Sequence, residues 1–343
     1  MIDGGHFNVY GFRFRVTSTG ETTATEGLAN DFAFFQSEPA PGTLEIRLTP
    51  AEPDYSGVPS SVASVYTPRN IAVTQGSLKF LDYGGRALAI LDRGANVFHV
   101  QSAHGDLLYE AAFLFLLSRM GEALDATRLH RIHAMALGYH GRAVLAILPM
   151  GGGKSTLGAA LLSEPDFDLL SDDSPLIAST GSVNAMPLRL GLLPGNEGSV
   201  PAEFRRTLDR MEFGPKILVK YSYFAHRVKA SAEPGIVFLG HRSLSKTCRI
   251  EPAGSVECFQ SIMANCVIGL GLFQGLEFVV NNSAFELAGK ARVGWSRLRN
   301  ARKLFNRSQV FRLILGRDRE ENARAVAAFV RERLPASPPA VKA

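Results

Sequence analysis

Residues 144–157 read VLAILPMGGGKSTL. The apolar beginning, Val144 to Leu148, predicts a buried β-strand, and the residues after Gly153 predict the first turn of a helix that continues to Leu162. The three glycines between them allow a tight turn whose N–H groups point inward, because glycine has no Cβ atom. With the positive end of the helix, such N–H groups form a cradle for a polyphosphate. We therefore expect a phosphate-binding loop here.

The residues that follow supply the chemistry of a Walker A loop. Lys154 would contact the β- and γ-phosphates of a nucleotide, and the hydroxyl of Ser155 would bind Mg²⁺. The strict pattern has glycine where this chain has Leu148. The alternative is a glycine cap or hairpin turn that happens to precede Lys-Ser, but the strand before it and the helix after it favour the phosphate loop. The expected nucleotide-binding residues are Gly151, Gly152, Gly153, Lys154, Ser155 and Thr156.

Composition limits the class of protein. A chain of 343 residues is long enough for two ordinary domains, and 46% hydrophobic residues with 20% charged ones are typical of a globular protein. The formal charge of +5 is modest but uneven. Its cations gather in a C-terminal basic segment, which we interpret as a solvated helix face, with a docking site as the alternative. The segment contains Arg297, Arg299, Arg302, Lys303, Arg307, Arg312, Arg317 and Arg319.

Other patterns bear on partners and location. No helix-turn-helix, zinc-finger or aromatic RNA-binding pattern is present, so no nucleic-acid partner is expected. The apolar run 261–280 is interrupted by polar residues and glycines, so it predicts a buried helix and no membrane span. Three cysteines without C-x-x-C spacing, and a beginning without a signal-peptide pattern, predict a cytoplasmic protein with reduced thiols.

The first part of the chain, residues 1–103, is expected to be a smaller β-rich domain without a catalytic group of its own. Residues 50–75 hold four prolines and many serines, and we expect an irregular loop there. A helix with an almost wholly apolar surface follows at 105–120. The expected strands are 7–16, 43–49, 78–83, 87–92 and 97–100.

The second part, residues 104–334, is expected to be the α/β nucleotide domain, followed by a disordered tail at 335–343. A hairpin turn at 139–142 should join strands 133–137 and 143–148. Further strands are expected at 167–173, 176–178, 185–192, 216–221, 235–240 and 309–315. Further helices are expected at 201–213, 255–275, 293–305 and 320–333.

Two adjacent carboxylates, Asp172 and Asp173, end the strand expected at 167–173. One can hold the metal and the other can accept a proton from an attacking hydroxyl, although an ordinary Asp-Asp turn is the alternative. Phosphoryl transfer also needs a further cation near the γ-phosphate. Arg189 is the first candidate, with Lys220 and Arg242 as weaker ones.

This arrangement resembles the catalytic domain of HPr kinase/phosphorylase, over residues 129–192. In that family a histidine precedes the loop lysine by twenty-one positions, as His133 precedes Lys154 here. The glycine pair before the strand is represented by Gly141, the acidic pair by Asp172 and Asp173, and the later Glu-x-Arg-Gly signature by Arg189. The resemblance implies a P-loop nucleotide domain with the architecture of phosphoenolpyruvate carboxykinase, and ATP- and Mg²⁺-dependent phosphorylation of a seryl hydroxyl.

By the same resemblance, Asp172 would be the base, Asp173 would be metal-linked together with Ser155, and His133 would lie near the reacting phosphate. The order of the two aspartates remains open. Leu148 and Met150 replace a glycine and a serine of the usual loop, and Pro187 replaces an acidic metal-linked residue. The chain looks more like the stand-alone relatives, some of which phosphorylate a precursor peptide, as lasso-peptide kinases do.

The expected activity is therefore that of a kinase whose acceptor is a seryl hydroxyl of a peptide or protein. The catalytic residues would be Asp172, His133, Arg189 and Lys154. Two alternatives remain: a small-molecule, sugar-type kinase with the same site, and a catalytically inactive nucleotide-binding sensor or scaffold. The sequence also leaves open the reverse phosphorylase reaction and the formation of a homo-oligomer.

Overall fold

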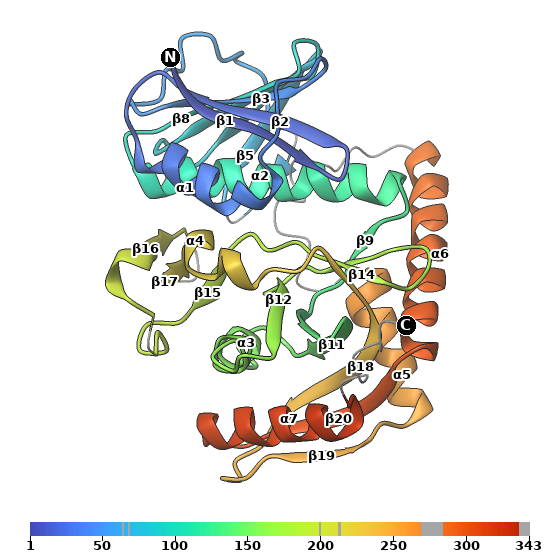
Figure 1. Cartoon of the computed structure of the whole chain (residues 1–343). Coiled ribbons are helices and arrows are strands. Elements are labelled where there is room, and N and C mark those ends of the chain that lie inside the picture. Colours follow the sequence, from blue (N-terminus) through green and yellow to red (C-terminus); the bar gives the residue numbers. More distant parts are fainter. Residues whose placement is uncertain (64, 68, 199, 212–213, 269–283, 336–343) are drawn as a thin grey trace, which may run out of the picture. The chain divides into compact units, whose positions relative to one another are not determined.

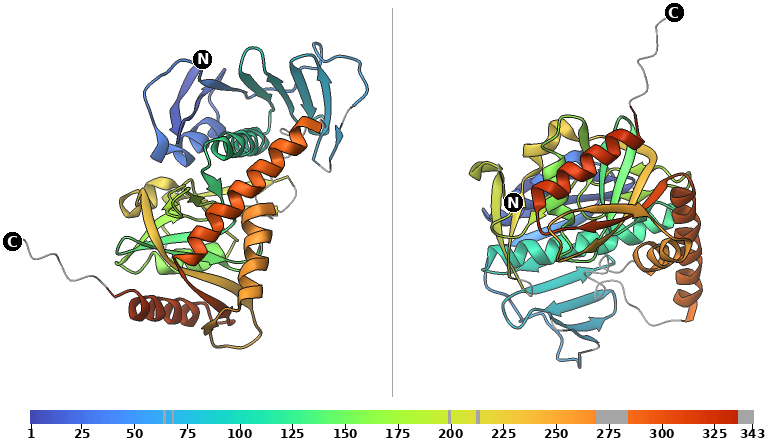
Figure 2. Two further views of the ribbon diagram at one scale, coloured as in Figure 1. Left: turned by 90° about the vertical axis from the view of Figure 1, so that its right-hand side faces the viewer. Right: turned by 90° about the horizontal axis from the view of Figure 1, so that it is seen from below.

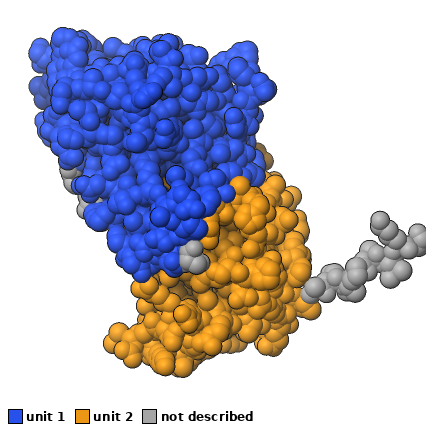
Figure 3. Space-filling view, turned by 60° about the vertical axis from the view of Figure 1, so that its left-hand side comes forward, with its two compact units in different colours: residues 1–123, 193–222, 274–281 blue, residues 124–192, 223–273, 282–343 orange. Residues whose placement is uncertain are grey.

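The computed structural model describes residues 1–335 apart from 64, 68, 199, 212–213 and 269–283. These residues form a mixed α/β protein with several sheets, as the sequence predicts at this level (Figure 1, with further views in Figure 2). They divide into two compact units, coloured in Figure 3: unit 1 has residues 1–123 and 193–222, and unit 2 has 124–192, 223–268 and 284–335. The domain boundary expected after residue 103 stays a prediction, and the expected tail lies outside the described residues from 336 onward.

The main sheet of unit 1 has the strand order β1-β2-β3-β8-β7-β6-β5-β4. β3 runs parallel to both β2 and β8, and the other neighbours are antiparallel. The helices α1 (Thr23–Asp31) and α2 (Gly105–Ala126) lie along one face of this sheet (Figure 1). The strands are β1 (Ile2–Val9), β2 (Phe12–Ser18), β3 (Leu44–Thr49), β4 (Val65–Tyr66), β5 (Ile71–Gln75), β6 (Leu78–Asp82), β7 (Leu88–Asp92) and β8 (Val97–Gln101).

Aromatic packing joins α2 to the covered face of the sheet. The ring of Phe115 in α2 stacks on that of Phe98 in β8, with the ring centroids 3.6 Å apart. Val16 and Ile46 pair in the same row of strands as Phe98, and all three are fully buried. The predicted apolar helix is confirmed, although it extends to Ala126.

Three details of the first hundred residues differ from expectation. Residues 7–16 are not one strand, because the chain turns at Tyr10 and Gly11, both at positive φ, to form the hairpin β1-β2. The alternation of apolar and polar residues continues across that turn, so it conceals the break. Residues 50–75 include β4 and β5, and α1, whose N-cap is Thr22, was not predicted.

The helix expected over 201–213 is wrong. The structure has a short 3₁₀ turn, η2 (Ala202–Phe204), followed by the strand β16 (Arg205–Arg210), which pairs antiparallel with β17 (Gly214–Val219). Leu208 is buried between exposed neighbours, as in a half-buried strand. Pairing with a later strand overrides the local helix propensity of the Glu-Phe-Arg-Arg run.

The sheet of unit 2 has the order β12-β10-β11-β18-β14-β13-β9, with β20 paired to β18 and β19 paired to β20. β11 and β20 both run parallel to β18, whereas β10 is antiparallel to β11 and β12. The predicted turn between β10 and β11 is confirmed, with His140 and Gly141 at positive φ. The strands of this sheet are β9 (His130–Arg131), β10 (Met135–Tyr139), β11 (Arg142–Ile147), β12 (Phe167–Ser171), β13 (Leu176–Ile177), β14 (Val183–Asn184), β18 (Ser231–Arg242), β19 (Arg249–Pro252) and β20 (Gln309–Leu315). The short strand β15 (Leu190–Leu192) is not part of it.

Helices pack around this sheet. α3 (Lys154–Leu161) contacts α7 (Arg319–Arg333), and α6 (Ala284–Asn306) contacts β13, β18 and β20. α5 (Ser255–Ser261) continues into a π-helix, η4 (Ile262–Ile268), which runs beside α6 (Figure 2). The helix expected over 255–275 thus changes type at Ile262, and residues 269–275 lie outside the described part. None of the helices described is long and apolar enough to cross a membrane.

Candidate functional site

The loop at residues 148–153 connects β11 to α3. β11 lies in the interior of the unit 2 sheet between β10 and the parallel strand β18, and its last residue is Ile147. α3 begins at Lys154. The strand, the turn and the helix expected around the glycines are therefore present, at the carboxyl end of a strand where α/β sheets commonly bind ligands.

Each of the three glycines is required by the backbone. Gly151 and Gly153 have φ values of 72° and 100°, which side-chain-bearing residues rarely adopt. A Cβ atom on Gly152 would lie 2.9 Å from the carbonyl oxygen of Pro149, to which the Gly152 N–H donates a hydrogen bond. Among the described residues no side chain caps α3, so the N–H groups of its first turn remain available to an anion.

The packing of Leu148 explains how the loop forms without the usual glycine at this position. Leu148 is buried over Gly240 of β18, where an added Cβ would lie 2.7 Å and 2.9 Å from the two Cδ atoms of Leu148. The side chain thus fills the space above a strand residue that has none. Met150, the second departure from the usual loop, is 61% exposed and packs into no core.

Lys154 is 7% exposed, and its ammonium group is held by three acceptors. Nζ donates to the carbonyl oxygens of Leu148 (2.7 Å) and Pro149 (3.3 Å) and lies 3.0 Å from Nε2 of His133. Burial lowers the pKa of Lys154, and the carboxylates of Asp173 and Asp172 oppose this shift. The three N–H groups of an ammonium are thereby accounted for, so Lys154 must exchange at least one of these bonds to contact a phosphate.

Asp172 lies beside the hydroxyl of Ser155. Its Oδ2 atom accepts hydrogen bonds from Ser155 Oγ and from the backbone N–H of Gly191, each at 3.0 Å. The bond places Gly191, two residues after the half-buried Arg189, next to Asp172. Asp172 is buried, so this carboxylate has a fixed position.

Asp173 contacts His133 instead. Its Oδ1 atom lies 3.2 Å from His133 Nδ1, and its side chain is 56% exposed. Because His133 Nε2 faces the ammonium of Lys154, that nitrogen acts as the acceptor, and the ring proton lies on Nδ1, where it can bond to Asp173. The backbone N–H of His133 also donates a hydrogen bond to the backbone carbonyl oxygen of Asn265 in η4, at 3.4 Å. The structure thus places Asp173, His133 and Lys154 in one continuous chain of contacts.

The oxygen atoms around Ser155 fit Mg²⁺. Mg²⁺ is usually held by one or two protein oxygens, by phosphates and by water. Ser155 Oγ and the carboxylate of Asp172 are two such oxygens within 3.0 Å of each other. Among the described residues no group of three or more His, Cys, Asp or Glu side chains could hold a metal ion, so phosphate oxygens and water would have to complete its coordination.

Cations outside the loop include one that lies next to it and one that lies near Asp173. A Cβ atom on Gly153 would lie 3.5 Å from Nη1 of Arg242, so this guanidinium is next to the start of α3. Arg131, which the sequence analysis did not single out, is only 8% exposed. Burial lowers its pKa to about 10, and Asp125 and Asp173 oppose the shift. Lys220 belongs to unit 1, where its Nζ donates to Glu203 O.

A buried ionic network lies next to Arg131 in unit 2. Asp125 bonds to Arg297 through both carboxylate oxygens and to His130 Nδ1 at 2.8 Å, while His130 Nε2 meets Ser296 Oγ at 2.8 Å. Burial raises the pKa of Asp125, but the hydrogen bonds from His130 and Arg297 outweigh it and hold the pKa below its ordinary value. Asp125 and His130 are far from Ser296 and Arg297 in the sequence, so only the fold reveals the network.

Several cations of the basic segment have structural partners. Arg297 bonds to Asp125, Lys303 donates to Ser179 O, Arg307 pairs with Glu233, and Arg312 pairs with Glu257. These bonds tie α6 and β20 to other elements of unit 2. They favour a structural interpretation of the segment over a docking site.

Protein-family models and curated protein sequences were both compared with the chain, and neither comparison gave a match. The interpretation of the site therefore rests on its geometry. That geometry brings together His133, the loop from Gly151 to Ser155, and both aspartates. The roles of these residues, and those of Thr156 and Arg189, stay predictions.

Proposed function

We propose that the chain is an ATP- and Mg²⁺-dependent kinase that transfers the γ-phosphoryl group to a hydroxyl, most simply a seryl hydroxyl of a peptide or protein. One observation carries the proposal: two acidic contacts converge on a glycine loop at a helix N-terminus. Asp172 is bonded to Ser155, and Asp173 is linked through His133 to Lys154. A loop that only capped a helix would need neither contact.

The contacts favour a division of roles opposite to the one that the resemblance implies. We assign Asp172 to the metal, because it is buried, fixed by Gly191, and adjacent to the Ser155 hydroxyl. We assign Asp173 as the base, because it is exposed enough to meet an acceptor and is oriented by His133. Bound Mg²⁺ would neutralise phosphate charge and orient the β- and γ-phosphates.

The residues of the chain then divide the reaction between them. The N–H groups of the loop and Lys154 would hold the β- and γ-phosphates, and Arg242, which lies next to Gly153, would supply the further positive charge. The acceptor oxygen bonds to the γ-phosphorus, the bond from that phosphorus to the bridging β–γ oxygen breaks, and ADP leaves. The hydroxyl proton passes to the carboxylate of Asp173, which the Nδ1–H of His133 keeps in position.

Leu148 bears on the alternative of an inactive nucleotide sensor. A leucine in place of the loop glycine would argue for a damaged site if it distorted the turn. Its side chain instead packs over Gly240, and its carbonyl oxygen bonds to Lys154. This supports an intact site with a different packing solution.

Phosphate transfer from [γ-³²P]ATP with Mg²⁺ tests the proposal, with peptides encoded beside the gene, sugars and water as acceptors. We expect label on a peptide seryl oxygen. Label on a sugar would favour the small-molecule alternative, and nucleotide binding without transfer to any acceptor would favour the sensor.

Two matched variants test the division of roles. Asp172→Asn should raise the Mg²⁺ concentration required for half-maximal rate by about tenfold or more. Asp173→Asn should leave that concentration unchanged while lowering kcat by about a hundredfold or more. The opposite pattern would restore the order that the resemblance implies.

A further inference from the structure

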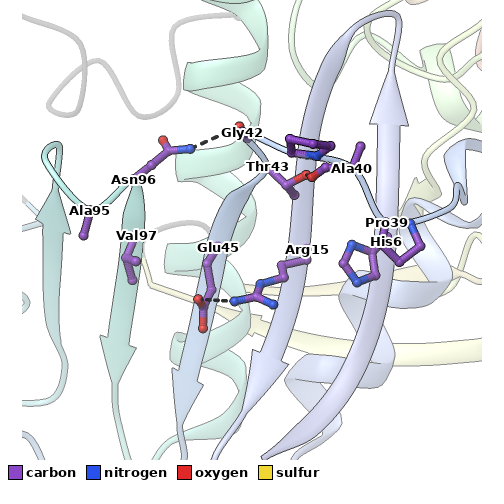
Figure 4. A pocket seen from close by; sticks show the side chains of 11 residues that line it. His6, Arg15, Pro39, Ala40, Gly42, Thr43, Glu45, Ala95, Asn96 and Val97 are labelled. Carbon is purple, nitrogen blue, oxygen red and sulfur yellow. Dashed lines mark hydrogen bonds and ion pairs between the residues drawn. The ribbon is translucent and has the colours of Figure 1, made fainter.

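A second polar site lies entirely within unit 1, on the face of the sheet opposite α1 and α2. The register aligns His6, Arg15, Glu45 and Val97 across the neighbouring strands β1, β2, β3 and β8. The chain from Pro39 to Thr43 runs beside this row, and the two line an open cavity of about 480 Å³ (Figure 4). This volume is in the range of small-ligand sites. We call this cavity the outer-face pocket.

The walls of the outer-face pocket are held by short polar contacts. Thr43 Oγ1 donates to Ala40 O at 2.5 Å, and the N–H of Glu45 donates to Asn96 O at 3.0 Å. Asn96 Nδ2 reaches Gly42 O at 3.4 Å. Together with Pro39 and Pro41, these bonds fix the shape of the pocket before any ligand arrives.

The charges in and beside the pocket leave one positive charge. Glu45 accepts hydrogen bonds from Arg15 (2.7 Å), Arg47 (3.1 Å) and Thr17 (3.1 Å). Burial raises the pKa of Glu45, but these hydrogen bonds outweigh it, so the pKa is lowered and the carboxylate stays ionised at neutral pH. Two guanidinium groups thus face one carboxylate.

Arg15 has hydrogen-bonding capacity left. Its side chain is 43% exposed, and among the described residues only Glu45 bonds to it, through Nη2. The Nε–H and Nη1–H groups remain for a ligand, and a planar guanidinium matches a carboxylate well. A phosphate dianion fits less well, because the neighbouring Glu45 would repel its larger charge.

We propose that the outer-face pocket binds a carboxylate on a short aliphatic stem, as an acidic peptide side chain or a free small acid presents it. Arg15 holds the carboxylate, while Pro39, Pro41 and Val97 contact the stem. This proposal does not depend on phosphoryl transfer, so either can fail without the other.

Saturation-transfer NMR titrations of the full chain test it with two carboxylate probes, glutarate and the blocked peptide acetyl-Gly-Glu-Gly-amide. Inorganic phosphate and the glutamine version of the peptide serve as comparison probes. We expect at least one carboxylate probe to bind and both comparison probes to bind at least tenfold more weakly. If only glutarate binds, the ligand of the outer-face pocket is a free small acid. If only the glutamate peptide binds, the ligand is an acidic side chain of a peptide. Equal binding of the glutamine peptide, tighter binding of phosphate, or no binding of either acid at about 10 mM would overturn the proposal.

Arg15→Gln should lower the affinity for the carboxylate probe that binds by about tenfold or more. The matched control is Arg13→Gln, which changes an exposed cation of the same strand outside the pocket and should alter affinity less than twofold. Ala95→Trp, at an exposed position in the wall, should block binding while leaving Arg15 in place. Unchanged affinity in both Arg15→Gln and Ala95→Trp would place the ligand elsewhere.

Discussion

The pair formed by Leu148 and Gly240 gives a sharp prediction, because Leu148 fits in its observed position only when residue 240 has no side chain. Gly240→Ala would put a Cβ atom 2.7–2.9 Å from the Cδ atoms of Leu148. Glycine-to-alanine changes at permissive sites stabilise by about 0.4–1 kcal/mol through the unfolded state, but overpacking a core costs about 1–3 kcal/mol. The clash is the larger effect, so we expect Gly240→Ala to lower the free energy of unfolding by about 1–2 kcal/mol.

Leu148→Ala alone should cost about 2–4 kcal/mol, because it leaves a cavity in a buried site. In the double variant the alanine at 240 occupies part of that cavity and meets no leucine. The double variant should therefore be more stable than the sum of the single effects by at least about 1 kcal/mol. Urea unfolding of the four proteins measures this coupling. Additive effects would mean that Leu148 does not pack on Gly240 and would remove our explanation for the missing loop glycine.

Three further predictions concern the loop and its surroundings. Gly153→Ala places a side chain at φ 100°, so it should lower the free energy of unfolding, measured in urea, by about 1–2 kcal/mol and should weaken the binding of MgATP. An unchanged midpoint of urea unfolding would contradict the backbone geometry. Arg131→Met removes a buried cation near Asp173, so phosphoryl transfer should fall about tenfold or more while stability stays equal or rises; normal transfer would assign Arg131 a structural role. Asp125→Asn breaks a buried ion pair and should cost about 3 kcal/mol at pH 7. The pKa of Asp125 is lower in the folded than in the unfolded protein, so its contribution to the free energy of unfolding is present at neutral pH and is lost as the pH falls below about 4. If the difference in the free energy of unfolding between wild type and variant did not shrink at pH 3, this assignment would be contradicted.

The elements that could be predicted carry their cause in adjacent residues. The three glycines between an apolar run and Lys-Ser-Thr specify the strand, the turn and α3, and the positive φ values of Gly151 and Gly153 agree with that reasoning. The resemblance implies that His133 lies near the reacting phosphate. That position stays a prediction, but the structure brings His133 Nε2 to 3.0 Å from Lys154 Nζ.

What could not be predicted depends on residues distant in the chain. The residues around Leu148 do not predict its contact with Gly240, and those around Arg131 do not predict that Arg297 of α6 lies near it. Adjacent residues can also have different partners, since Asp172 bonds to Ser155 whereas Asp173 contacts His133. A sequence does not determine which carboxylate faces which partner. The sequence predicts a helix where the structure has β16 for the same reason, since the pairing partner of this strand, β17, comes later in the chain.

The central claim is that residues 148–157 bind the phosphates of a nucleotide through Lys154. The most direct test is a titration of a fluorescent ATP analogue with Mg²⁺ into wild type, Lys154→Met and the control Lys229→Met, an exposed lysine of the same unit. Loss of a charged hydrogen-bond donor costs about 1.5–3 kcal/mol. We predict that Lys154→Met binds at least about tenfold more weakly, with Lys229→Met equal to wild type. Equal affinity in all three proteins, or no binding by the wild type, would contradict the account.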